Sequence, residues 1–167
     1  MQRLYGIVDD QGILRDINAT TFPTHQSTLT CYTLLTNAVD KQPDAICAGA
    51  RPIEKRIHEQ NDTTHAQVEK MTFADKIEWL TFAQYKNQID NLAAGIKAFA
   101  SLEKGDRVVI YAETRREWMI AAYGCWRQGY QVVTVYATLG EEGLVHAVSQ
   151  TKAKLIVADA KLLPVMA

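Results

Sequence analysis

The stretch that decides the fold of this 167-residue chain is RVVIYAETRREWMIAAYGCWRQGYQVVTVY, residues 107–136. It contains two β-branched apolar runs, 108–111 and 132–136, and a third run follows at 155–158. Apolar runs without polar alternation are typical of strands buried on both faces, as in a parallel sheet. Successive runs begin 24 and then 23 residues apart, which leaves room for one helix and two short loops. We therefore predict an α/β fold, a parallel sheet built of βαβ units with right-handed crossovers and flanked by helices.

Three threonines, each followed three residues later by Gln or Glu, predict the starts of the flanking helices. The pattern is a capping box, in which the hydroxyl and the amide or carboxylate satisfy free backbone N–H groups. Thr81, Thr114 and Thr138 carry it, and the helices are predicted at about 82–99, 115–128 (ending at Gly129) and 139–150. Spacings of three and four place these residues on the inward faces: Phe82, Tyr85, Ile89, Leu92, Ile96, Phe99, Trp118, Met119, Ala122, Cys125 and Trp126.

The N-terminal half has weaker patterns. Two short apolar runs around Asp9–Gly12 suggest a hairpin, and a helix is expected from Thr30 to about Asp40. Residues 51–75 are polar and show almost no apolar periodicity, so we predict an exposed loop there. The remaining expectations are strands at 4–8, 13–15, 45–48 and 76–80, with Leu34, Leu35, Ala38 and Val39 inward on the helix. The predicted organisation is a hairpin and first helix (1–50), an exposed loop (51–75) and a βαβ sheet region (76–167).

Composition excludes several classes of protein. Hydrophobic residues make up 47% of the chain, and 18 Lys and Arg balance 19 Asp and Glu, so nothing favours a nucleic-acid partner. No apolar run approaches a membrane span of about 20 residues, and the N-terminus lacks the pattern of a signal peptide. Cys31, Cys47 and Cys125 form no paired motif and are expected to be buried, reduced thiols. The expected location is intracellular, in the cytoplasm or peripheral to an organelle membrane.

The four histidines do not form a convincing metal site. His58 and His65 share a polar stretch with two carboxylates, but the H-E-x-x-H spacing is absent, so a solvated loop is favoured. His146 is expected at a boundary or core position of its helix, and His25 lies in a Thr-rich loop.

Other candidate residues lie at the ends of the predicted strands. Arg115 and Arg116 could hold a phosphate at a helix start, although a first-turn Glu117 beside solvated arginines is the favoured interpretation. Tyr136 and Thr138 follow the carboxyl end of a strand, where open α/β sheets bind ligands. No glycine-rich phosphate loop and no G-x-S-x-G nucleophile motif is present.

Several stretches together resemble a known family. GDRVVIYAETRREW (105–118) is similar to the early segment of long-chain fatty-acyl-CoA synthetases, which are adenylate-forming enzymes of the AMP-binding superfamily. The likeness covers roughly residues 28–163 and includes these further stretches: AVDKQPD (38–44), EWLTF (78–82), NLAAGI (91–96), GCWRQ (124–128) and VVTVYATLGEE (132–142).

The resemblance implies an ATP-dependent ligase in which a fatty acid carboxylate attacks the α-phosphate of ATP in the presence of Mg²⁺. CoA then displaces AMP from the acyl-adenylate. In the family, the phosphate loop, the metal-binding Glu, the ribose-binding Asp and the mobile Lys all lie downstream of the matched segment. We therefore assign no catalytic, cofactor-binding or metal residue here, and we expect this chain alone to be inactive and to bind no cofactor tightly.

The resemblance also implies that the chain is the N-terminal portion of an AMP-binding domain, incomplete without the remainder of its enzyme. Expected partners are that remainder, a fatty acid, a membrane surface contacted peripherally by the whole protein, and a second copy held through an exposed apolar face. The alternative is a stand-alone, non-catalytic α/β module for interaction or dimerisation. A flavodoxin-like ligand binder is disfavoured, because residues 112–114 are acidic and lack glycine.

Overall fold

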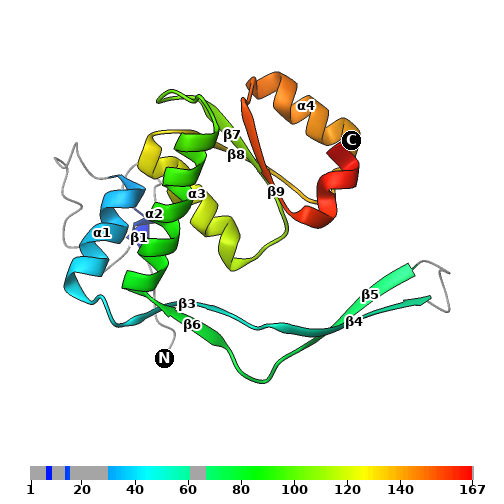
Figure 1. Ribbon diagram of the computed structural model, residues 1–167, viewed down its shortest axis with the longest axis horizontal. Helices are drawn as coiled ribbons and strands as arrows, with labels where there is room; N and C mark the ends of the chain where they lie inside the picture. The colour runs from blue at the N-terminus through cyan, green and yellow to red at the C-terminus, as the bar shows by residue number, and fades with distance from the viewer. Residues whose placement is uncertain (1–6, 9–13, 16–29, 61–66, 167) are drawn as a thin grey trace.

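The computed structural model describes residues 7–8, 14–15, 30–60 and 67–166. Figure 1 shows a body of helices and parallel strands, from which a long β-hairpin projects. The helices are α1 (Cys31–Lys41), α2 (Phe82–Phe99), α3 (Arg116–Gln128), α4 (Glu141–Thr151) and the 3-10 helix η1 (Ala160–Met166). The strands are β1 (Ile7–Val8), β2 (Leu14–Arg15), β3 (Ile46–Ala50), β4 (Ile53–Gln60), β5 (Gln67–Phe73), β6 (Glu78–Thr81), β7 (Arg107–Tyr111), β8 (Gln131–Val135) and β9 (Leu155–Ala158).

The predicted parallel sheet is confirmed. Its strand order is β8-β7-β9, and both outer strands run parallel to β7. Val109, for example, lies opposite Val133 on one side and Ile156 on the other. The central strand therefore has a neighbour on each side, which explains why its sequence carries no polar alternation.

Helices cover both faces of this sheet, so the region has three layers. Ile110 packs against Ala121 and Ala122 of α3, whereas Val109 and Tyr111 pack against Leu144 of α4. Helix α2 lies beside α3 on the same face: its Ile96 shares a cluster with Val108 of β7, and its Ile89 shares one with Ile120 of α3. The four residues Val108 to Tyr111 are completely buried, and they form the centre of the core.

One of the three predicted capping boxes is confirmed. Thr81 caps α2, because its hydroxyl accepts from the Gln84 N–H while the Gln84 side chain accepts from the Thr81 N–H. The predictions for Thr114 and Thr138 were wrong. Helix α3 begins after Arg115 and α4 after Gly140, and neither has a side-chain cap.

The competing contacts explain both differences. The Glu117 carboxylate pairs with the Arg115 guanidinium rather than reaching back to a threonine. Before α4, the Tyr111 hydroxyl donates to the Leu139 carbonyl at 2.8 Å, and the helix begins two residues later than expected, at Glu141.

Most of the predicted inward residues are buried or half-buried, but three were wrong. Leu34 is 55% exposed, Phe99 85% and Met119 38%. Phe99 is the last residue of α2, one turn beyond the last buried position. In α3 the pattern missed Ile120 and Ala121, which are buried because the helix packs against α2 as well as against the sheet. Gly129 ends α3 as expected, with a left-handed φ of 76°.

The predicted N-terminal hairpin is confirmed for the residues that the structure describes, the strands β1 and β2. Antiparallel pairing joins Ile7 to Arg15 and Val8 to Leu14, while the expected turn at 9–12 lies outside the described residues. Helix α1 begins after Thr30 with a capping box formed with Thr33. Strands β3 and β6 form a separate antiparallel pair, close to the two strands predicted at 45–48 and 76–80.

The prediction of a loop over residues 51–75 was wrong. Strands β4 and β5 pair along most of this segment and form a hairpin, called the arm below, that makes its own two-stranded sheet. Almost every residue of the arm is exposed, as the polar composition predicted. Because no face of the arm is buried, its sequence carries no clear alternation of apolar and polar residues.

None of the helices in the described part of the chain is both long enough and apolar enough to cross a bilayer.

Candidate functional site

The strand order places a crevice at one edge of the parallel sheet. Helix α3, which follows β7, packs on one face of the sheet, whereas η1, which follows β9, packs through Leu162 and Val165 on the other face, beside α4. The loops after β7 and β9 therefore leave the sheet toward different sides. In open α/β sheets, ligands bind outside the carboxyl ends of the strands at such a point. Tyr111 ends β7 and Ala158 ends β9, and the residues that follow them are therefore the first candidates for a site.

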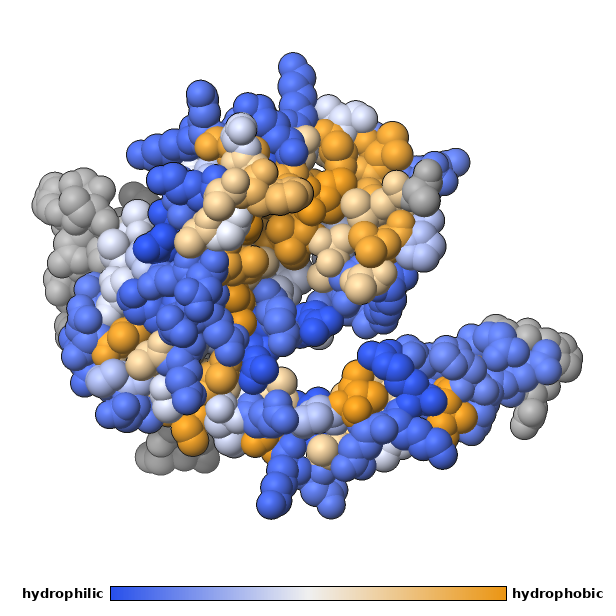
Figure 2. Space-filling view, in the orientation of Figure 1, coloured by the Kyte–Doolittle hydropathy of each residue, from blue (hydrophilic) through white to orange (hydrophobic). Residues whose placement is uncertain are grey.

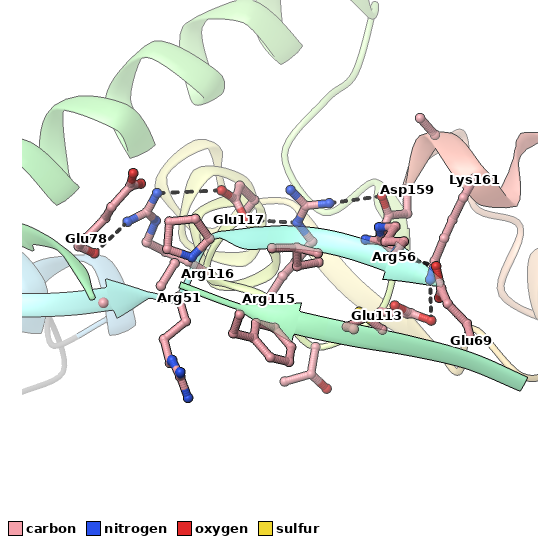
Figure 3. A pocket seen from close by; sticks show the side chains of 18 of the residues that line it. Arg51, Arg56, Glu69, Glu78, Glu113, Arg115, Arg116, Glu117, Asp159 and Lys161 are labelled. Carbon is pink, nitrogen blue, oxygen red and sulfur yellow. Dashed lines mark hydrogen bonds and ion pairs between the residues drawn. The ribbon is translucent and has the colours of Figure 1, made fainter. Parts of the chain in front are cut away.

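A large cavity, called the first cavity below, lies at this edge. It has a volume of about 1150 Å³ and lies between the arm and the carboxyl ends of β7 and β9. Figure 3 shows its two walls, with arm residues on one side and the start of α3 and of η1 on the other. Its lining includes Ile53, Arg56, His58, Glu69, Met71, Phe73, Glu113, Arg115, Arg116, Glu117, Asp159 and Lys161.

Ion pairs neutralise most of the charge in the first cavity. Arg115 bridges two carboxylates, with Nε 2.9 Å from Glu117 Oε2 and Nη1 3.0 Å from Asp159 Oδ1. The hydrogen bond from Arg115 holds the pKa of Glu117 below its usual range. Lys161 Nζ lies 2.5 Å from Glu113 Oε1. These pairs tie the loop after β7 to the segment after β9 across the crevice.

Arg116 is placed differently from Arg115. Its side chain is only 14% exposed, so the expectation of two solvated arginines was wrong for this one. Its Nη1 donates to the Glu78 carbonyl at 3.3 Å, and its buried Nε has no hydrogen-bond partner among the described residues. Arg116 therefore anchors the start of α3 to β6, and its Nη2 also lies 3.8 Å from Glu117 Oε1 in the cavity wall.

The two strand-end candidates, Tyr136 and Thr138, line a different space. This second cavity has a volume of about 670 Å³ and lies beside the ends of β7 and β8. Tyr136 is 79% exposed there, and Trp118 of α3 lines the same cavity. The sequence thus placed Tyr136 and Thr138 at an edge of the sheet where the structure has a cavity. It missed the first cavity, because the arm that lines it was predicted to be a loop.

The histidines remain dispersed in the described part of the chain. His58 lies on the arm and lines the first cavity, whereas His146 is exposed on α4, contrary to the boundary or core position expected. His25 and His65 lie outside the described residues. Across the ranges that the structure describes, no three His, Cys, Asp or Glu side chains are grouped as a metal site.

The cysteines differ in their surroundings. Cys125 is buried, Cys47 is half-buried, and Cys31 is exposed, so the expectation of three buried thiols was wrong for Cys31. Burial raises the pKa of Cys47 and raises that of Cys125 to about 11. Neither thiol is thereby suited to nucleophilic chemistry, because the thiolate is the reactive form.

Comparison with known proteins relates this arrangement to a family. Residues 54–166 match the family described as AMP-binding enzyme. Long chain acyl-CoA synthetase 8 of Arabidopsis thaliana is 37% identical over 86 residues, which are 52% of this chain and 12% of that protein. Long-chain-fatty-acid--CoA ligase 1 of Saccharomyces cerevisiae is 29% identical over 153 residues, 85% of this chain and 22% of that protein.

A solved structure shows the same fold. The A-PCP didomain of carboxylic acid reductase from Segniliparus rugosus, determined in complex with AMP, aligns with 84% of this chain and 19% of its own. The TM-score is 0.65 at 14% sequence identity. The chain spans less than a quarter of the length of the two curated relatives named above. With its family match extending over more than half of its residues, the chain belongs to the AMP-binding enzyme family.

Proposed function

We propose that this chain is the opening section of a longer, ATP-dependent long-chain fatty acid–CoA ligase. The observation that carries the proposal is the family match over residues 54–166 together with relatives named as long-chain acyl-CoA synthetases or ligases. The whole enzyme would use ATP, Mg²⁺ and CoA, and its substrate would be a fatty acid. Its location would be intracellular, in the cytoplasm or at an organelle surface.

The residues of this chain would supply scaffold rather than chemistry. Phosphoryl groups are held by preorganised backbone N–H groups, cations and metal ions. In the first cavity Arg56, Arg115 and Lys161 are paired with carboxylates of the chain itself, and Arg51 donates to the Ala74 carbonyl. The sequence contains no glycine-rich phosphate loop, so we assign no ATP site, no Mg²⁺ site and no reaction step to the described residues.

ATP–pyrophosphate exchange with palmitate tests this division of roles. We expect exchange, and palmitoyl-CoA formation, with the full-length protein and none above the no-enzyme blank with the 167-residue chain. Exchange by the short chain would contradict the scaffold role. A native product in the source cells with a mass of 18.7 kDa would instead support a non-catalytic module.

The second cavity would contribute to the ligand-binding surface of the whole enzyme, as its position at the carboxyl edge suggests. Replacing an exposed aromatic side chain that contacts a ligand typically weakens binding about 2- to 10-fold. We therefore expect Tyr136→Ala in the full-length protein to raise KM for ATP, CoA or the fatty acid by that factor. Phe99→Ala, an even more exposed aromatic outside the cavities, is the control. Three unchanged KM values for Tyr136→Ala would refute the assignment.

A further inference from the structure

The face of the arm that lines the first cavity carries exposed apolar side chains. The strand register places six residues on this face, and all of them line the cavity: Ile53, Arg56, His58, Glu69, Met71 and Phe73. Ile53, Met71 and Phe73, called the apolar strip below, lie at the base of the arm and are 39%, 37% and 42% exposed. Figure 2 shows the hollow between the arm and the body, with hydrophobic side chains on the arm among hydrophilic ones.

The arm has little to stabilise it within the described part of the chain. Strands β4 and β5 pair only with each other there. The ion pairs that the arm makes among the described residues are internal, joining Arg56 to Glu69 and Lys70 to Glu59. A two-stranded hairpin on its own is marginally stable in water, and packing against a further element stabilises it. The apolar strip is the surface of the arm that such packing would bury.

The walls of the first cavity do not suit a small anionic ligand. Five cationic side chains and five carboxylates line it, so the walls carry no net charge to attract a phosphate-rich ligand, a nucleic acid or an anionic membrane surface. The volume of about 1150 Å³ also lies above the range of about 300–1,000 Å³ that is typical of small-molecule sites. A large, neutral groove with an apolar strip suits a stretch of polypeptide.

The length of the relatives indicates which polypeptide that is. The chain spans 12% and 22% of the two curated relatives named above. In the longer protein proposed above, more than three quarters of the polypeptide therefore lies outside these residues. Tethering within one molecule gives a segment an effective concentration that can reach the mM range. A segment of the same molecule is thus favoured over a second copy or a separate protein.

We propose that the first cavity is an intramolecular docking groove, which holds a segment of the longer protein from beyond residue 167. Apolar side chains of that segment pack on Ile53, Met71 and Phe73, and its neutral backbone faces the ion pairs of the body wall. The docked segment supplies the packing that the arm lacks. This inference rests on the proposed function, because it requires the longer protein, but it involves no step of the reaction.

Photo-cross-linking of the full-length protein tests the proposal. A benzophenone amino acid replaces Met71 in one variant and Val68 in the control. Val68 is 40% exposed, against 37% for Met71, but it pairs with Glu59 on the opposite face of the arm and does not line the cavity. After irradiation, peptide mass spectrometry identifies the attached residues. We expect position 71 to cross-link to residues beyond 167 of the same molecule, and position 68 to give few such products.

The rate of thiol modification is a second measurement on the same two positions. Met71→Cys in the full-length protein should react with iodoacetamide about 10-fold or more slowly than Val68→Cys, because its modification would require local opening of the docked segment. Peptide mass spectrometry follows each site separately, so other cysteines do not interfere.

Four results would overturn the proposal. These are equal reaction rates at the two positions without cross-links beyond residue 167, equal protection of both positions, cross-links from position 71 to a second copy, and cross-links to residues 1–29. Palmitoyl-CoA formation by the same preparation separates this inference from the proposed function. An active ligase with an unprotected Met71→Cys would refute the docking groove alone, whereas cross-links beyond residue 167 in a protein without ligase activity would refute the proposed function alone.

Discussion

Gly129 shows how much one backbone conformation matters at the end of α3. Its φ of 76° lies in the left-handed region, and a Cβ there would lie 2.8 Å from Cγ of Lys104. A side chain in this conformation costs about 1–2 kcal/mol. We expect Gly129→Ala to lower the free energy of unfolding by that amount in urea denaturation.

Gly95 provides the matched control, because it lies inside α2 and a Cβ there would meet nothing within 4 Å. Gly95→Ala should raise the stability by about 0.5–1 kcal/mol, since alanine is the better helix former. If both substitutions changed stability in the same direction, the conformational account of Gly129 would be wrong.

Burial of the Cys125 thiol leads to a prediction about reactivity. A pKa of about 11 instead of 9.0 lowers the thiolate fraction near neutral pH about 100-fold. Iodoacetamide should therefore modify the exposed Cys31 far faster than Cys125 in the native protein, as peptide mass spectrometry would show. Unfolding in urea should remove the difference. Equal native rates would mean that the core around β7 and α3 opens readily.

At the scale of elements, Asp90 joins three helices. Its Oδ1 accepts from the Tyr32 hydroxyl of α1 at 2.6 Å and lies 2.8 Å from Arg127 Nε of α3, while its Oδ2 lies 2.6 Å from Lys86 Nζ of α2. Burial tends to raise the pKa of Asp90, but the hydrogen bonds from Lys86 and Tyr32 outweigh it and lower the pKa. The charged carboxylate therefore stabilises the contact between the helices.

The sign of the pH dependence follows from that lowered pKa. The stabilisation is fully present above the ordinary pKa of an aspartate and is lost as the pH falls through the lower folded value. We expect Asp90→Asn to cost about 1–2 kcal/mol near pH 7 and almost nothing in strong acid, measured by urea denaturation at each pH. Asp40→Asn, at the exposed end of α1, should change little at any pH. A cost for Asp90→Asn that persisted in acid would contradict the role of charge.

The elements also show what a single sequence can predict. The βαβ region was predictable because Val108–Tyr111 is buried on both faces, and full burial leaves an unambiguous apolar run. The arm was not predictable, because cross-strand pairs such as Arg56–Met71 stabilise it without a buried face. Tyr136 was identified from its place after a strand. The cavity positions of Glu69 and Lys161 were missed, because both residues line the first cavity only through the paths of the arm and of the turn into η1.

At the scale of the whole molecule, the outer edges of the sheet and one face of β3–β6 have no partner among the described residues. Among the described residues, the outer strands β8 and β9 each pair only with β7. Register places Ile46, Gly49 and Trp79 on one face of the β3–β6 pair, where Ile46 is 61% and Trp79 52% exposed. Unpaired strand edges and exposed apolar faces favour association with other chains.

We therefore expect the 167-residue chain, prepared alone, to self-associate as its concentration rises, and light scattering would measure this. Trp79→Ser should weaken the association, because it removes the largest apolar side chain from the β3–β6 face without touching the buried core. Phe99→Ser removes an exposed aromatic from the end of α2 and should change the association much less. In the full-length protein the same Trp79→Ser substitution should instead lower the free energy of unfolding, because the remainder of that protein would cover the β3–β6 face. A monodisperse monomer at high concentration would contradict this prediction, because it would show that the exposed strand edges and the β3–β6 face do not drive association.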